Sequence, residues 1–111
     1  MGCCPVILLD THIWVRWLAG DPSLAASIVD QVAEADELAV SAISCWEVAY
    51  LAKRGRLQLS MPITDWLDIG LRRTGVVCLA VGEEIALTAA KLPDHHRDPA
   101  DRIIIATALA R

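Results

Sequence analysis

The chain has 111 residues and a formal net charge of −4 at pH 7. This length is close to the usual size of one domain, so we expect residues 1–111 to form a single domain. Hydrophobic residues make up 55% of the sequence, which is enough for a substantial core. The acidic balance excludes a protein that coats nucleic acid through a general basic field, but it does not exclude a local cationic patch.

The four cysteines show neither the C-x-x-C spacing nor the paired His-Cys signature of a zinc site. Cys45 and Cys78 lie in apolar stretches and are interpreted as small buried side chains with reduced thiols. No apolar run approaches the roughly 18 residues that a membrane helix needs. The beginning of the chain lacks the features of a signal peptide. We therefore expect a cytoplasmic protein that does not bind a membrane.

Short apolar runs alternate with helical patterns from one end of the chain to the other. Strands are predicted over residues 6–9, 38–41 and 76–80. Helices are predicted over residues 11–19, 23–35, 44–54, 65–73, 82–92 and from 99 to the end. This alternation predicts an α/β domain with a parallel sheet, in which ligands bind at the carboxyl ends of the strands.

Asp10 directly follows the first predicted strand and precedes the first predicted helix. One interpretation is an N-cap, because Asp accepts hydrogen bonds well at that position. The other is a metal ligand at the end of a strand. The two roles are compatible, since a cap uses only part of the carboxylate.

Glu47 has two competing interpretations. The segment Ser44-Cys45-Trp46-Glu47 matches a capping box, in which the Glu side chain reaches back to the backbone N–H of the Ser. Alternatively, Glu47 supplies a carboxylate to a site shared with other elements.

Asp98 and Asp101 begin the last predicted helix. Asp98 precedes Pro99, a combination typical of a helix N-terminus, and Asp101 complements the helix dipole. The helix that follows is apolar nearly all round, which indicates that it is buried. A carboxylate at the head of a buried helix is well placed for a functional site.

One function explains these carboxylates together. Mg²⁺ and Mn²⁺ prefer oxygen ligands, and an ion held by two or three carboxylates remains open to a phosphodiester. Such a site requires separate elements to converge, so we predict that Asp10, Glu47 and Asp101 lie close together in the fold.

The ordered motifs resemble those of PIN-domain ribonucleases, and specifically toxins of the VapC type. The matching segments are Leu8-Leu9-Asp10-Thr11-His12, Ser41-Ala42-Ile43-Ser44-Cys45-Trp46-Glu47-Val48, His96-Arg97-Asp98-Pro99-Ala100-Asp101-Arg102 and Ile105-Ala106-Thr107-Ala108. The resemblance implies a three-layer α/β fold, with a central parallel sheet flanked by helices. It also implies that Asp10, Glu47 and Asp101 are catalytic and bind Mg²⁺ or Mn²⁺, and that Asp98 occupies the preceding acidic position of the metal site.

The implied activity is that of a metal-dependent endoribonuclease toxin, which hydrolyses RNA and is neutralised by a cognate antitoxin protein. The resemblance also implies a homodimer, and an antitoxin that docks along the first two helices. PIN domains usually continue into another strand with a fourth Asp, whereas this sequence ends at Arg111, so we expect the last strand to be missing. This departure leaves open an alternative function as a catalytically incomplete module that binds an antitoxin or a second copy.

Four basic residues are candidates for contacts with RNA phosphates, as a hypothesis that follows from this resemblance. They are Lys53, Arg54, Arg97 and Arg102. For those near the C-terminal end of a helix, complementing the helix dipole is an equally simple explanation.

Overall fold

A parallel sheet with the strand order β1-β2-β3 organises the chain. The computed structural model describes residues 6–110. The strands are β1 (Val6–Leu8), β2 (Glu37–Ser41) and β3 (Val77–Leu79). Leu8 pairs with Ala39, and Ser41 pairs with Leu79, so β2 lies between its two neighbours. The predicted α/β class and parallel sheet are confirmed.

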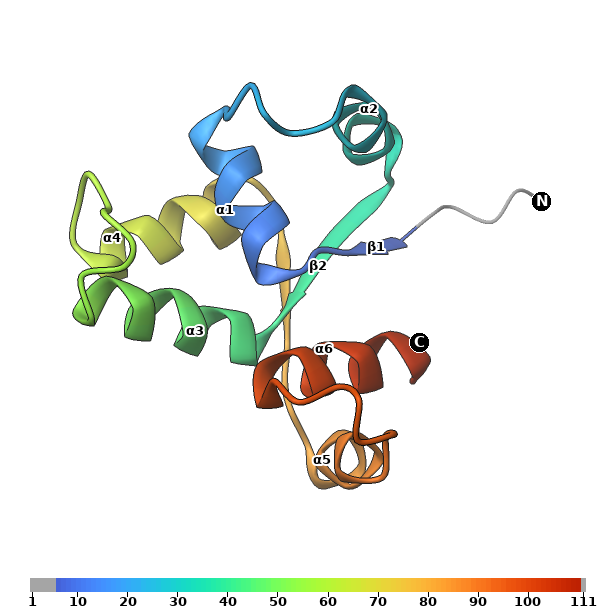
Figure 1. The fold of residues 1–111 in the computed structure, drawn as a ribbon. Coiled ribbons are helices and arrows are strands. Elements are labelled where there is room, and N and C mark those ends of the chain that lie inside the picture. Colours follow the sequence, from blue (N-terminus) through green and yellow to red (C-terminus); the bar gives the residue numbers. More distant parts are fainter. Residues whose placement is uncertain (1–5, 111) are drawn as a thin grey trace.

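Helices fill the connections between the strands and also follow the last strand. They are α1 (Thr11–Ala19), α2 (Ala26–Glu34), α3 (Ala42–Lys53), α4 (Ile63–Leu67), the π-helical η1 (Asp68–Arg73), α5 (Glu83–Ala90) and α6 (Pro99–Leu109). Figure 1 shows α1 and α2 on one side of the sheet and α5 with α6 on the other. Within residues 6–110, no helix is long and apolar enough to cross a membrane.

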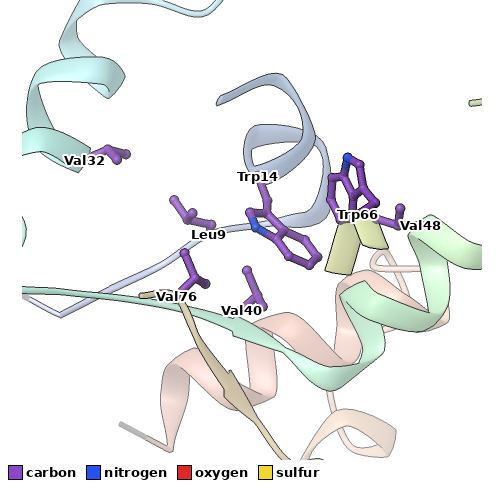
Figure 2. Close-up of a cluster of buried hydrophobic side chains, with 7 residues drawn as sticks. All are labelled: Leu9, Trp14, Val32, Val40, Val48, Trp66 and Val76. Atoms are coloured by element: carbon purple, nitrogen blue, oxygen red, sulfur yellow. The ribbon is translucent and has the colours of Figure 1, made fainter. Parts of the chain in front are cut away.

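Trp14 is the centre of the core between α1 and the α4–η1 segment. Its side chain is fully buried and meets Trp66 edge to face, with ring centroids 4.8 Å apart (Figure 2). The indole Nε1 donates a hydrogen bond of 3.2 Å to the carbonyl oxygen of Gly70. A Cβ atom at Gly70 would lie 3.0 Å from a methyl carbon of Leu18, so this close approach favours glycine.

The boundaries of α2 and of the α4–η1 segment are among those that differ from the predicted ones. α2 begins at Ala26 rather than at residue 23, because the residues before it form a turn around Asp21. The backbone N–H of Ser23 donates to the Asp21 carboxylate over 2.8 Å, and the N–H of Leu24 donates to the Asp21 carbonyl over 3.2 Å. The helix predicted over residues 65–73 begins earlier, at Ile63, and its second half is π-helical.

Candidate active site

Three helices begin at the same end of the sheet. α1 follows β1 and α3 follows β2, and these parallel neighbours deliver both helices to the carboxyl edge of the sheet. Figure 1 shows α6 beginning beside the start of α3 and below the start of α1. Asp10 is the N-cap of α1 and Asp101 lies in the first turn of α6, whereas Glu47 lies beyond the first turn of α3.

Asp10 is the N-cap of α1. Its Oδ1 accepts a hydrogen bond of 2.8 Å from the backbone N–H of Ile13, while the side chain as a whole is exposed. The predicted cap is therefore confirmed. Because the cap uses Oδ1, the second carboxylate oxygen remains available to another ligand.

Asp98 caps α6 in the same way. Its Oδ1 accepts hydrogen bonds from the backbone N–H groups of Ala100, over 2.8 Å, and of Asp101, over 3.3 Å. Pro99 occupies the first helical position, as the sequence predicts.

The pKa of Asp101 is affected by the neighbouring acidic groups. Partial burial raises this pKa above the ordinary 3.8, and the nearby charges of Asp98 and Asp10 raise it further. His12 and His96 act in the opposite direction. Asp98 and Asp10 therefore lie within electrostatic reach of Asp101, although Asp10 is distant from the other two in the sequence.

Glu47 does not belong to a capping box. α3 begins at Ala42, two residues earlier than predicted. Its N-cap is Ser41, whose Oγ accepts a 3.2 Å hydrogen bond from the N–H of Ile43. Ser44 is instead buried inside the helix and receives a 2.8 Å hydrogen bond from the hydroxyl of Thr11. The half-buried Glu47 side chain therefore does not cap α3. The remaining interpretation is that it supplies a carboxylate to a functional site.

A metal site requires several ligands to lie around one point. Within residues 6–110, no three or more side chains of His, Cys, Asp and Glu lie close enough together to hold one ion. Asp98 and Asp10 act on the pKa of Asp101, whereas Glu47 is not among the charges that shift it. Carboxylate groups that repel one another suit a hard divalent cation, which binds oxygen ligands. Mg²⁺ commonly takes only one or two carboxylates from the protein and completes its octahedral coordination with water. The residues present therefore fit such an ion.

Arg102 has a structural role that the sequence analysis missed. Each of its five N–H groups donates to a backbone carbonyl, at distances from 2.6 to 3.1 Å. The acceptors lie at the end of α5 and in the following loop: Ala89, Ala90, Leu92, Pro93 and His96. All five guanidinium N–H groups are thus taken up by main-chain carbonyls, which leaves none to donate to an RNA phosphate.

The other basic candidates are exposed. Lys53 and Arg54 lie at the C-terminal end of α3, away from the beginning of that helix, and Arg97 directly precedes Asp98. Sequence patterns could not have revealed the structural role of Arg102, because all of its hydrogen-bond partners are main-chain carbonyls.

Comparison with known proteins places the chain in a family. The PIN domain family matches residues 7–111. A relative named Ribonuclease VapC22, from Mycobacterium tuberculosis (strain ATCC 25618 / H37Rv), is 39% identical over 104 residues, which are 93% of this chain and 78% of the relative. No solved structure gave a significant match. The chain therefore belongs to the PIN-domain family and, within it, to the VapC type.

Proposed function

We propose that the protein is an Mg²⁺- or Mn²⁺-dependent endoribonuclease toxin that hydrolyses phosphodiester bonds of RNA. The observation that carries this proposal is the approach of Asp10, Asp98 and Asp101, which raises the pKa of Asp101, at the carboxyl edge of a PIN-type sheet. Carboxylates that repel one another are stabilised when a cation lies between them. The name of the relative, Ribonuclease VapC22, supports the same activity.

The proposed roles follow from the positions of the side chains. Asp10 and Asp101 hold the cation, Asp98 adds negative charge beside them, and Glu47 either ligates the ion or orients the attacking water. A divalent ion bound there would activate water and neutralise the charge that develops on the phosphate oxygens. Lys53, Arg54 and Arg97 are the basic residues that remain candidates for contacts with RNA phosphates.

Family membership also suggests partners. We propose a cytoplasmic homodimer, inhibited by a cognate antitoxin that covers the carboxylates and docks along α1 and α2. An antitoxin arginine would pair with these acids, because a guanidinium binds a carboxylate through two parallel hydrogen bonds.

A second candidate is an interaction module without nuclease activity. The observation that favours it is the lack, within residues 6–110, of three metal-binding side chains gathered at one point. In that case Asp10 and Asp98 would act only as helix caps, and the protein would bind an antitoxin or a second copy without metal-dependent cleavage.

One experiment separates the two functions. RNA is incubated with the purified 111-residue chain, with Mn²⁺ or with a chelator, beside the variant Asp10→Asn. Asn keeps the N-cap of α1, so the variant loses charge at the site without losing the helix cap. Metal-dependent cleavage that disappears in Asp10→Asn supports the nuclease, whereas a folded chain that leaves RNA intact in Mn²⁺ supports the interaction module.

A further inference from the structure

An aromatic pair is exposed on the outer face of α3. Trp46 and Tyr50 stack with ring centroids 5.0 Å apart and an angle of 12° between their planes. The two residues are 55% and 42% exposed, respectively, although large aromatic side chains are usually buried. Arg54 follows one turn later, with its guanidinium carbon 5.8 Å from the centroid of the Tyr50 ring. We call Trp46, Tyr50 and Arg54 the aromatic ladder.

The aromatic ladder is not part of the hydrophobic core. Val48 and Ser44 form the buried face of α3 and are completely covered, whereas the ladder occupies the exposed face. Stacked rings held in water keep apolar surface that a ligand with a flat face can cover. The ladder is therefore a preformed binding surface whose rings are already aligned.

The two ends of the ladder differ. A cation lies over Tyr50 at one end, whereas at the other end no further aromatic ring within residues 6–110 stacks on Trp46. Side chains on a helix lean towards its N-terminus, so Trp46 leans towards the beginning of α3. That is where α1 and α6 also begin (Figure 1), and Trp46 directly precedes Glu47 in the chain. Trp46 is thus the member of the ladder nearest to the helix N-termini that carry Asp10 and Asp101.

We propose that Trp46 stacks on an unpaired base of single-stranded RNA beside the scissile phosphate, while Arg54 binds a phosphate farther along the strand. The inference rests on the proposed nuclease function and adds the surface of α3 that binds the RNA strand. RNA is favoured over a protein partner because Lys53, Arg54 and Arg56 place positive charge at one end of the ladder, in a chain whose net charge is −4. A single strand is favoured over a duplex because bases in a duplex are stacked on one another and have no free face.

The test measures RNA binding without cleavage. Fluorescence anisotropy with a labelled single-stranded RNA, and with the duplex of the same sequence, is recorded for Asp10→Asn in a chelator. In this background Trp46→Ala should weaken single-strand binding by roughly 5- to 100-fold, the range for loss of one stacked base, and leave duplex binding unchanged. Trp46→Phe should retain most of the affinity. Leu87→Ala is the matched control, because Leu87 is 58% exposed on α5, and it should have no effect.

Salt dependence separates the roles within the ladder. Trp46→Ala should leave the slope of log affinity against log salt unchanged, because stacking releases no counterions. Arg54→Gln should reduce that slope by about 1, as expected for the loss of one phosphate contact.

The inference is overturned if Trp46→Ala binds the single strand as tightly as its parent, or if it loses duplex and single-strand binding equally. It is also overturned if the substitution changes only self-association of the chain, which would identify the ladder as a contact between copies. RNA binding through Trp46 by a wild-type chain that cuts no RNA would support the ladder and refute the nuclease. RNA cleavage that does not depend on Trp46 would support the nuclease and refute the role of the ladder.

Discussion

The hydroxyl of Thr11 donates a 2.8 Å hydrogen bond to the hydroxyl of Ser44, and both side chains are buried. The bond joins the first residue of α1 to the first turn of α3. Asp10 precedes Thr11 directly, and Glu47 follows Ser44 by one turn, so this contact ties together the two helices that carry these acidic residues.

The first prediction concerns this pair. Ser44→Ala should lower the free energy of unfolding by about 1–3 kcal/mol, because the buried Thr11 hydroxyl loses its partner. Thr11→Val combined with Ser44→Ala should destabilise the chain by less than the sum of the single changes, since neither hydroxyl is then left unpaired. Urea unfolding of the three variants measures the coupling. Strictly additive effects would show that the hydrogen bond does not hold the two helices together.

The second prediction concerns Arg102. Arg102→Lys should lower the free energy of unfolding by roughly 2–4 kcal/mol, because an ammonium has three donors and cannot reproduce the guanidinium geometry. Its carbonyl partners lie in the segment that leads to Asp98, so RNA cleavage should fall as well. The control is Arg97→Lys, at an exposed neighbouring position, which should change stability by less than about 0.5 kcal/mol. Equal melting temperatures of the two variants would refute the structural role of Arg102.

The third prediction follows from the pKa of Asp101. This pKa is raised in the folded state, so the protonated form favours folding; the benefit is complete below the ordinary pKa of 3.8 and is lost as pH rises through the raised value. At pH 7 the ionised carboxylate therefore weakens the metal-free fold. Asp101→Asn should raise the melting temperature in a chelator at pH 7 and abolish cleavage, and it should remove stabilisation by Mn²⁺.

Thermal unfolding with and without Mn²⁺ provides the measurement, and Asp30→Asn provides the control. Asp30 is exposed on α2, far from the site in the chain, and its replacement should leave both the melting temperature and the response to Mn²⁺ nearly unchanged. A lower melting temperature for Asp101→Asn in the chelator would contradict the repulsion among the carboxylates.

The fourth prediction concerns Cys45. Burial, together with the Cys78 thiol 3.9 Å away, raises the pKa of Cys45 from 9.0 to about 12. The neutral thiol therefore favours the fold, and this stabilisation is lost as pH rises between about 9 and about 12. Cys45→Ala should make the loss of stability in that window less steep, which unfolding curves at several pH values would reveal. If Cys45→Ala left the loss of stability between about pH 9 and about pH 12 unchanged, the raised pKa of Cys45 would be refuted.

Alkylation offers an independent check. At pH 8 iodoacetamide should modify the exposed Cys78 before the half-buried Cys45, because the thiolate is the reactive form and Cys45 stays protonated. Peptide mapping by mass spectrometry gives the order of modification.

The sequence predicts well those features that depend on local patterns. The alternation of short apolar runs with helical periods gives the parallel sheet, and an Asp placed before a helix gives the caps at Asp10 and Asp98. Membership of the PIN family was also predictable, because its motifs occur in order along the chain. The roles of individual acidic residues at the metal site remain a prediction.

Features that depend on distant partners were not predictable. Ser41 and Ser44 are both acceptable N-caps by sequence, and the choice between them depends on Thr11, which lies in another helix. Cys78 lies in an apolar strand but is exposed, and Cys45 is only half buried, so the expectation of two buried thiols was wrong. A short apolar strand does not reveal which of its faces is left uncovered by neighbouring elements.

The approach of Asp10 to Asp101 has a consequence for the order of events during synthesis. Asp10 precedes Asp101 in the chain and emerges from the ribosome before it, and the proposed site forms only when both have folded into place. Under the proposed function, a nascent chain attached to the translating messenger is harmless to RNA until α6 has emerged. An inhibitor that binds the early helices could therefore reach the chain before it first becomes active.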